Sequence, residues 1–542
     1  MKIHLIFAAS MLVFIFVSVQ SGAAQATPMG DWTGGFFTGG NWVIVDVRFN
    51  REKETLRGNA DVTFPSYSNS VSARNVELKS LKSDAAKIEF EIPFNTEKIV
   101  FRGQMQEKTI SGEYEYATAR GDFGLTRIVS LDAPTLEKYY GAYRVSPDRV
   151  ISIFRSLSDP RAVWFIDYKT GRVGTLWAEA EDRFFTGDGR GISYPATLKV
   201  SFAKDSNGTI KDLKWQSATE PDLAAQKISL KEEAITFQNG RVTLGGTLIL
   251  PPGGGQYPVV IVTPGDFGTN RNQLRWWAHN FASRGIAALI FDSRGAGASG
   301  GTAGSNSFDV LANDVLAAVG VLKNRADINP KKIGLFGFSN SAWTVSLAAS
   351  RSTDVGFLIL QSLSGVPPFE QEIFRAETQL RADKFPENTI KKGGDFMRLK
   401  FGAARTGAGW EQIEKIMNAA QSERWLAYTN PPRSLEGLQR FWNAGANYNP
   451  APALEKLKIP VLAFWGANDT YVPAQKSIAV FKRAMTKAGN TNYTIKFIPK
   501  GRHDLVEGES GSPSIGARLK KFPAGFWKMQ IDWILSRVKT AG

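Results

Sequence analysis

The chain has 542 residues, of which 43% are hydrophobic and 22% are charged. This balance is typical of globular proteins and excludes a fibrous or low-complexity chain, while the length predicts two or three domains rather than one core. The sequence has no cysteine, which excludes disulfides, thiolate metal sites and a cysteine nucleophile.

The formal net charge is +15. A basic protein is attracted to anionic surfaces, so we expect a weak association with the anionic surfaces of a cell envelope. The lysines and arginines are spread along the chain, without a basic stripe interleaved with aromatic residues. The sequence therefore does not predict a nucleic-acid partner.

The first 26 residues are typical of an export signal. Lys2 supplies a positive start, residues 3–19 are almost entirely apolar, and Ala24 and Ala26 are the small residues that a signal peptidase requires. We expect the mature chain to begin at Thr27 and to be periplasmic or secreted. An uncleaved membrane anchor is the alternative, because the apolar run is close to the shortest that spans a bilayer. No later segment reaches ~18 apolar residues, so stable membrane insertion is not expected after cleavage.

Residues 27–130 and 131–228 predict two β-rich domains. Short apolar or alternating runs, such as 41–49 in the first and 163–168 in the second, are typical of strands separated by turns. Each domain is expected to be a sandwich or a barrel. Whether the two regions form one barrel, two barrels or one continuous sheet is left open by the pattern.

Residues 229–542 change to strands that alternate with helices. Continuous apolar runs, typical of buried parallel strands, occur at 259–262, 287–291, 333–336, 357–360 and 461–464. Amphipathic helical segments lie between them. This alternation predicts an α/β domain with a doubly wound, mostly parallel sheet.

An insertion at about 366–455 interrupts this alternation with helical segments and no strong strand. An insertion between late strands of such a sheet lies over their carboxyl ends, where ligands bind, so we interpret it as a helical lid. A peripheral decoration without a gating role is the alternative. Its aromatic residues either line an acyl pocket or form the core of the lid; they are Phe369, Phe374, Trp410, Trp425, Phe441 and Trp442.

Ser339 lies in the segment Gly-Phe-Ser-Asn-Ser directly after the predicted strand at 333–336. A serine on a tight strand-to-helix turn has a strained backbone and an exposed hydroxyl, and small flanking residues are needed to make the turn. Ser341 occupies the place where this motif usually has glycine. The position after a buried strand makes Ser339 the candidate nucleophile.

A serine hydroxyl needs a base within hydrogen-bond reach, and the chain has three histidines. His4 lies in the predicted signal, and His279 is expected on the solvent-facing side of a helix. His503 lies in a loop directly after the predicted strand at 493–499. We therefore predict that His503 is the base.

The imidazole needs a carboxylate that fixes its tautomer. Asp469 follows the predicted strand at 461–464, and the chain order Ser339, Asp469, His503 is the order expected for this fold. Asp504 is the competing candidate, but adjacent side chains in a loop diverge. We predict Asp469.

An oxyanion formed at Ser339 needs hydrogen-bond donors. We expect one from the backbone N–H of Asn340, which follows the nucleophile. The second is expected from the loop after the strand at 259–262, where position favours the backbone N–H of Asp266.

Together these segments resemble the α/β-hydrolase superfamily, in particular bacterial exported esterases of the dienelactone-hydrolase and prolyl-oligopeptidase-like branch with a β-rich N-terminal region. The resemblance covers about 229–542, with Pro264 standing where the family usually has histidine. It also includes the loop 292–299, whose Asp, Arg and Gly residues we expect to be structural.

The leading hypothesis is hydrolysis of a small-molecule carboxylic ester through an acyl-enzyme, with no metal or organic cofactor. A serine peptidase or amidase is the first alternative, because the same three residues serve both reactions. The second alternative is a non-catalytic envelope-binding protein. The sequence leaves the oligomeric state and the identity of the acyl and alcohol groups open.

Overall fold

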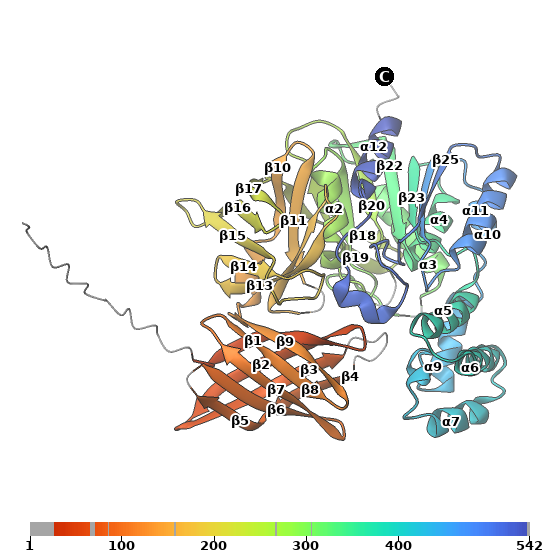
Figure 1. The fold of residues 1–542 in the computed structure, drawn as a ribbon. Coiled ribbons are helices and arrows are strands. Elements are labelled where there is room, and N and C mark those ends of the chain that lie inside the picture. The colour runs from red at the N-terminus through yellow and green to blue at the C-terminus, as the bar shows by residue number, and fades with distance from the viewer. Residues whose placement is uncertain are drawn as a thin grey trace, which may run out of the picture.

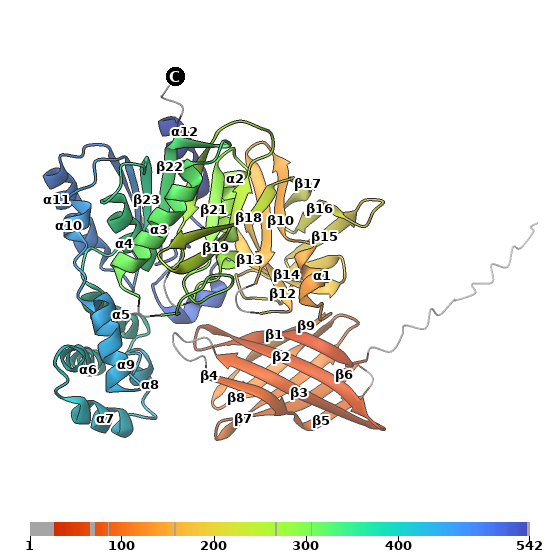
Figure 2. The same ribbon diagram turned by 180° about the vertical axis from the view of Figure 1, so that it is seen from behind.

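The structure, a computed structural model, describes residues 27–64, 71–84, 86–156, 159–265, 268–304 and 306–538. The predicted export signal lies outside the described residues. The described chain forms two β-domains and then an α/β domain with a helical insertion (Figure 1, and from behind Figure 2). No helix within these ranges is long and apolar enough to cross a membrane.

The first β-domain is a nine-stranded antiparallel sheet in which β1 lies between β2 and β9. Residues of β6 alternate between buried and partly exposed. The buried side chains of the whole sheet, such as Trp32 of β1 and Phe101 of β7, form one aromatic-rich core. The interior is therefore packed with side chains. The strands are β1 (Gly30–Thr38), β2 (Asn41–Glu52), β3 (Thr55–Phe64), β4 (Val71–Glu77), β5 (Lys79–Asp84), β6 (Lys87–Phe94), β7 (Glu97–Met105), β8 (Thr109–Tyr116) and β9 (Ala119–Ile128).

The second β-domain is a closed eight-stranded barrel, separate from the first sheet, so the two β-rich regions form two sheets rather than one. A short helix, α1 (Ala133–Glu137), precedes it, with the side chain of Asp132 capping its first turn. The strands are β10 (Gly141–Ser146), β11 (Arg149–Arg155), β12 (Ala162–Asp167), β13 (Val173–Ala180), β14 (Arg183–Thr186), β15 (Leu198–Lys204), β16 (Ile210–Ser217) and β17 (Glu220–Lys227).

The α/β domain has an eight-stranded sheet in the order β18-β19-β21-β20-β22-β23-β24-β25. The six strands β21, β20, β22, β23, β24 and β25 pair in parallel with their neighbours. At one edge, β18 pairs antiparallel with β19, and β19 pairs antiparallel with β21. This is the mostly parallel sheet predicted from the apolar runs. The strands are β18 (Lys231–Asn239), β19 (Val242–Leu250), β20 (Tyr257–Val262), β21 (Ala287–Phe291), β22 (Ile328–Phe338), β23 (Phe357–Gln361), β24 (Val461–Gly466) and β25 (Tyr493–Ile498).

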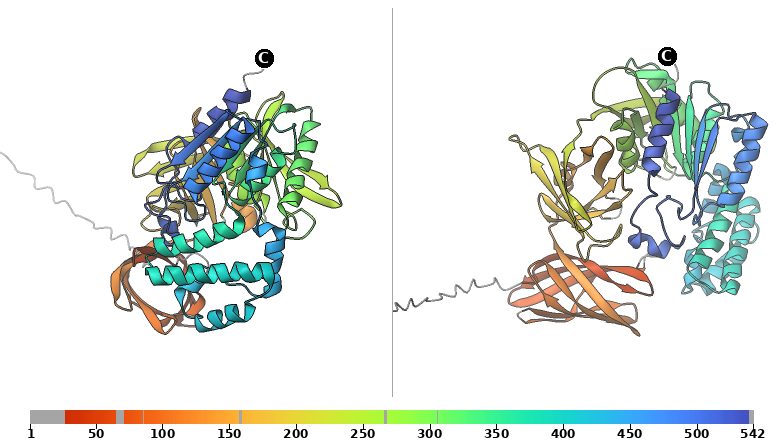
Figure 3. Two further views of the ribbon diagram at one scale, coloured as in Figure 1. Left: turned by 90° about the vertical axis from the view of Figure 1, so that its right-hand side faces the viewer. Right: turned by 45° about the horizontal axis from the view of Figure 1, so that its top comes forward.

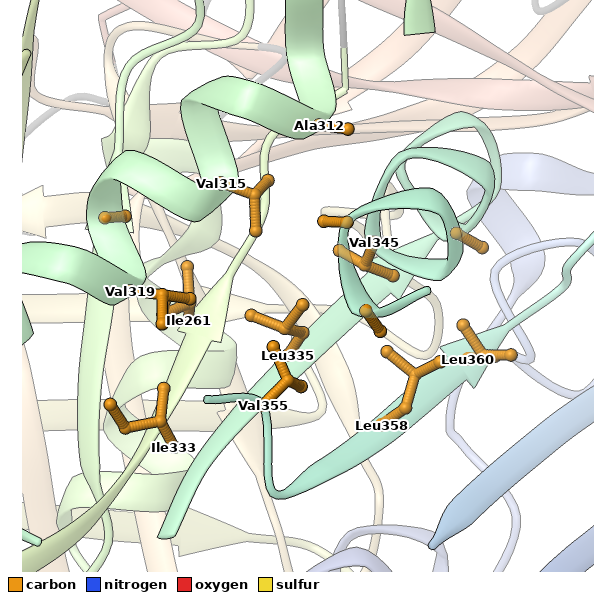
Figure 4. Close-up of a cluster of buried hydrophobic side chains, with 14 of the residues drawn as sticks. Ile261, Ala312, Val315, Val319, Ile333, Leu335, Val345, Val355, Leu358 and Leu360 are labelled. Atoms are coloured by element: carbon orange, nitrogen blue, oxygen red, sulfur yellow. The ribbon is translucent and has the colours of Figure 1, made fainter. Parts of the chain in front are cut away.

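Helices cover both faces of this sheet, each against its own core. One core joins the sheet to α3, α4 and α11, and Figure 4 shows part of it, including Ile261, Val315, Leu335 and Val345. The other core lies under α2 and α12. The helices are η1 (Arg271–Leu274, 3-10), α2 (Arg275–Ala282), α3 (Phe308–Lys323), α4 (Asn340–Ala349), α11 (Ala474–Ala488), η3 (Pro513–Arg518, 3-10) and α12 (Phe526–Val538).

The closed barrel packs against the α/β domain through β11. Ile151 and Ile153 of this strand point into the barrel core, whereas Val150 and Phe154 join the core under α2 and α12. Both faces of the strand are buried, which explains its continuous apolar run.

The expectation that His279 faces solvent is wrong. Its side chain is 1% exposed, because the barrel covers this side of α2, and its Nδ1 lies 2.7 Å from Oγ of Ser152 on β11. A helical period shows which side of a helix faces its own sheet, but it cannot show that a second domain covers the other side.

The insertion lies between β23 and β24 and is entirely helical, and Figure 3 shows its helices as a group of their own beside the α/β domain. It has its own core, which includes Trp425. Its helices are α5 (Pro368–Ala382), α6 (Glu387–Thr406), α7 (Trp410–Ala419), α8 (Arg424–Ala427), α9 (Leu435–Phe441), the π-helical turn η2 (Trp442–Ala446) and α10 (Ala451–Leu454).

Candidate active site

Ser339 lies between β22 and α4, at the carboxyl end of a central strand of the sheet. Its backbone has φ 54° and ψ −116°, a left-handed conformation that is strained for a residue with a side chain. The turn is held because the Ser339 N–H donates to the carbonyl oxygen of Gln361 over 2.9 Å. The strained turn predicted for the candidate nucleophile is therefore present.

The small residues around Ser339 are required by close packing. A Cβ on Gly337 would lie 2.6 Å from the carbonyl oxygen of Ser341 and 2.6 Å from Cγ2 of Val345. Ser341, which replaces the usual glycine, is buried, and its hydroxyl bonds both the N–H and the carbonyl oxygen of Phe338, at 2.9 and 3.0 Å. Its side chain thus helps to close the turn.

His503 reaches Ser339 from the loop after β25. Its Nε2 lies 2.8 Å from Oγ of Ser339, and its Nδ1 lies 2.9 Å from Oδ2 of Asp469. The histidine side chain is 14% exposed, so most of the ring is packed. The structure brings the three predicted side chains into one hydrogen-bonded line.

Asp469 lies in the loop after β24, and its carboxylate is completely buried. Oδ1 accepts hydrogen bonds from the backbone N–H groups of Tyr471 and Val472, at 2.7 and 2.9 Å, which leaves Oδ2 for His503. Asp504, the competing candidate, points elsewhere: its carboxylate accepts from Arg190 of the closed barrel at 2.9 Å.

Neighbouring side chains hold the His503 ring and its loop in place. The ring of Tyr471 stacks on the imidazole with centroids 4.6 Å apart, and the ring of Phe338 lies 5.1 Å away. After β23, the Ser362 hydroxyl donates to the carbonyl oxygen of His503 over 2.8 Å. These positioning residues were not predicted from the sequence, although Ser362 follows a predicted strand, which is the signal that could have identified it.

Asn340 is the first residue of α4, so its backbone N–H is one of the donors at the N-terminus of that helix. These donors and the helix dipole favour negative charge beside Ser339. Asp266, the second predicted oxyanion donor, lies outside the described residues.

The loop 292–299 has the structural role expected from its sequence. The Asp292 carboxylate accepts from the backbone N–H of Arg271 and of Ala298, at 2.7 and 2.8 Å. Arg294 forms an ion pair with Asp314 at 2.6 Å, and Gly295 and Gly297 have positive φ angles. The loop braces the segments that contain Arg271 and Asp314.

A cavity of about 780 Å³ opens at Ser339 and Asn340, between the sheet and the helical insertion. This volume is within the range of small-molecule sites, roughly 300–1,000 Å³. Leu438 and Phe441 of α9, Phe401 of α6 and Trp343 of α4 supply apolar walls. Among the insertion aromatics considered in the sequence analysis, Phe441 lines the cavity, whereas Trp425 is buried in the core of the insertion.

The insertion is tied to the loop that carries Asp469. The Thr378 hydroxyl of α5 donates to the carbonyl oxygen of Thr470 over 2.9 Å. Ser512, in the segment that follows His503, bonds the carboxylate of Asp383 at the end of α5. Any displacement of α5 therefore acts on the loop of the candidate acid. Across the described ranges, no group of three acidic, histidine or cysteine side chains is placed to hold a metal ion.

Comparison with known proteins agrees with this fold. Residues 258–510 match the model of a family described as serine aminopeptidase, S33. A putative carboxymethylenebutenolidase from Synechocystis sp. is 30% identical over 141 residues, which are 23% of this chain and 56% of the relative. An uncharacterized 31.7 kDa protein of Escherichia coli is 28% identical over 268 residues, which are 48% of this chain and 89% of that protein. The chain spans about half the length of the first of these relatives.

Solved structures are similar over part of the chain. An esterase of Pyrococcus furiosus has a TM-score of 0.38 at 19% identity, over 57% of this chain and 91% of that one. A proline iminopeptidase of Mycobacterium smegmatis has a TM-score of 0.37 at 12% identity, over 57% of this chain and 100% of that one.

The sheet order, the turn at Ser339 and the family match define the class of protein. The C-terminal domain is an α/β-hydrolase domain of the α/β-hydrolase superfamily, with relatives of the dienelactone-hydrolase type, and a β-rich N-terminal region precedes it.

Proposed function

We propose that the chain is a serine hydrolase that cleaves carboxylic esters with Ser339, His503 and Asp469. One observation carries the proposal: the imidazole of His503 lies between the Ser339 hydroxyl, at 2.8 Å, and the buried Asp469 carboxylate, at 2.9 Å. A hydroxyl is a weak nucleophile until a base accepts its proton, and this geometry supplies the base together with the acid that orients it.

In this mechanism, Oγ of Ser339 attacks the acyl carbonyl carbon while Nε2 of His503 accepts the hydroxyl proton. The Asp469 carboxylate accepts a hydrogen bond from the Nδ1–H group and stabilises the imidazolium that forms. The tetrahedral intermediate collapses, the carbonyl re-forms and the alkoxide leaves with the proton from Nε2. Water then attacks the carbonyl carbon of the acyl-enzyme while His503 accepts a proton from it, and the carboxylic acid product is released as Ser339 regains its proton. The backbone N–H groups of Asn340 and Asp266 are our proposed oxyanion donors.

Export is a second part of the proposal. It is supported by the apolar run at residues 3–19 followed by Ala24 and Ala26, which favours a periplasmic or secreted enzyme. The net charge of +15 favours a weak attraction to anionic envelope surfaces.

A peptidase is the second candidate function, because the matching family model is described as a serine aminopeptidase. We favour ester cleavage because one relative is named as a putative carboxymethylenebutenolidase, and a butenolide is a cyclic ester. The same three residues serve both reactions, so substrates must decide between them.

The test combines active-site labelling with a substrate comparison. A fluorophosphonate probe should label the wild-type protein and leave Ser339→Ala unlabelled. 4-Nitrophenyl esters should be hydrolysed by the wild type, and aminoacyl 4-nitroanilides should be poor substrates. A wild-type protein without labelling would overturn the hydrolase proposal, whereas faster anilide than ester cleavage would replace the esterase with a peptidase.

A further inference from the structure

A buried lysine lines the cavity at Ser339. Lys400 belongs to α6 of the insertion, and it is among the residues that line the cavity together with Ser339. The residue is 6% exposed. Its Nζ donates to two backbone carbonyl oxygens, those of Thr429 at 2.9 Å and Asn430 at 2.7 Å. An ammonium has three N–H donors, so one remains beyond these two bonds.

The charges around Lys400 do not neutralise it. Glu372 of α5 is the carboxylate whose charge favours the ammonium, but its Oε2 already accepts from Nε and Nη2 of the buried Arg375, at 3.0 and 2.8 Å. Lys400 at the cavity wall and Arg375 behind it therefore share the charge of Glu372. Burial lowers the pKa of Lys400 to about 8, which leaves the side chain mainly protonated at pH 7.

The rim of the cavity adds positive charge. Arg433 and Arg440 line the same cavity, and Glu372 is the acidic residue among its described lining residues. Arg440 is partly neutralised, because its guanidinium pairs with Glu436 at 2.5 Å. A cavity with this balance of charge attracts anions and disfavours cations.

A buried, incompletely neutralised cation is unfavourable unless something compensates for its lost hydration. If Lys400 served only to hold the chain at Thr429, a neutral donor such as glutamine would satisfy the carbonyl oxygens at a lower cost. An anionic group of a substrate, bound in the cavity, would compensate for the charge and use the remaining N–H.

We propose that Lys400 determines specificity by binding a second, ionised carboxylate of the substrate, so that the cavity takes anionic esters in preference to neutral ones. This inference rests on the proposed function, because it names the substrate class of the same site. Lys400 binds the substrate at a distance from the ester bond and takes no part in the proton transfers.

The test compares esters that match in length and differ in charge. One series has the charge on the acyl side: 4-nitrophenyl half-esters of glutaric, adipic and suberic acid against 4-nitrophenyl alkanoates of equal length. A second series has it on the alcohol side: carboxyalkyl butyrates against alkyl butyrates. In at least one series, kcat/KM of the wild type at pH 7 should be about tenfold higher for the anionic ester, mainly through a lower KM.

Lys400→Met should reduce this preference to about one, and Lys400→Arg should keep most of it, because the charge is retained. The matched control is Lys391→Met, on the same helix, where the lysine is 78% exposed and pairs with Asp395. This control should keep the wild-type preference. The preference of the wild type should also decline above about pH 8, as Lys400 loses its proton beside Glu372 and Arg375.

Two results would overturn the inference while leaving the proposed function intact: equal kcat/KM for anionic and neutral esters in both series, or a preference that Lys400→Met does not change. If Lys400→Met unfolds, the conservative Lys400→Gln replaces it in the same comparison. If no ester is hydrolysed, the proposed function fails instead. In that case adipate should still raise the melting temperature of Ser339→Ala, and the absence of this shift would overturn the anion site as well.

Discussion

The guanidinium of Arg190, in the closed barrel, lies 2.9 Å from the carboxylate of Asp504, the residue that follows His503. The backbone of the same loop is bonded from the sheet, since the Gln361 amide donates to the carbonyl oxygen of Asp504 over 3.2 Å. The candidate base is therefore positioned by two domains, and the barrel contributes directly to the geometry of the site.

Arg190→Gln should lower kcat moderately without changing KM, because the loop of His503 loses one of its attachments while the cavity stays intact. The two side chains are 25% and 32% exposed, and partly exposed ion pairs contribute about 0.2–1 kcal/mol, so the decrease should be at most about fivefold. Steady-state kinetics with a 4-nitrophenyl ester measures it.

Arg190→Lys keeps the charge and should recover part of the loss. A purely structural role for Arg190 would lower the melting temperature and leave kcat unchanged at a temperature where the protein is folded. That result would contradict a positioning role.

Asp469→Asn should lower kcat by about 10³–10⁴-fold, because an amide cannot fix the required tautomer of His503 or stabilise its protonated form. Asp504→Asn is the matched control, since it changes the adjacent carboxylate of the same site in the same way. Asp504→Asn should lower kcat by no more than Arg190→Gln does. If Asp504→Asn were the more damaging change, Asp469 would not be the acid.

The core of the α/β domain was predictable because each buried parallel strand is a continuous apolar run. The runs at 259–262 and 461–464 lie within β20 and β24, and the segment at 493–499 corresponds to β25. Ser339, Asp469 and His503 each follow such a strand, and the carboxyl ends of parallel strands lie at one edge of the sheet. Their proximity thus depends on local signals that the sequence contains.

Other features depend on contacts between distant segments, which no local pattern encodes. Lys400 is one of several lysines on α6, and its sequence context does not distinguish it from the exposed Lys391. The closure of the second barrel depends on the pairing of β10 with β17, and a period of two residues does not specify a partner strand. For the same reason, the burial of His279 was not foreseen.

Gly337→Ala should destabilise the domain and reduce activity, because the added Cβ would lie 2.6 Å from a backbone oxygen at the turn that presents Ser339. Overpacking of this kind costs about 1–3 kcal/mol. Thermal unfolding and fluorophosphonate labelling rates measure the two effects.

Gly320→Ala is the opposite case and serves as the control. Gly320 lies on the exposed side of α3, and its added Cβ would meet no atom within 4 Å. Replacement of glycine by alanine in a helix should stabilise the protein by about 0.5–1 kcal/mol. Equal destabilisation by both substitutions would contradict the packing argument for Gly337.

The contact between His279 and Ser152 should make the interface between the closed barrel and α2 sensitive to acid. Burial lowers the pKa of His279 below its ordinary value of 6.5, with the neighbouring Arg275 and Lys227 acting in the same direction and Glu232 opposing them. In the unfolded chain the imidazole binds a proton below about pH 6.5, whereas the folded protein keeps it neutral. Stability is therefore complete above pH 6.5 and should fall as the pH decreases, by up to about 1.4 kcal/mol per pH unit.

The melting temperature of the wild type should accordingly fall between pH 7 and pH 5, and His279→Gln should reduce this fall, because glutamine can bond Ser152 without titrating. Glu232 does not account for the difference in this window, since its pKa is lowered from 4.5 to about 2 and its contribution is lost only at more acidic pH. An identical pH dependence in the wild type and in His279→Gln would mean that the buried imidazole does not limit the stability of the interface.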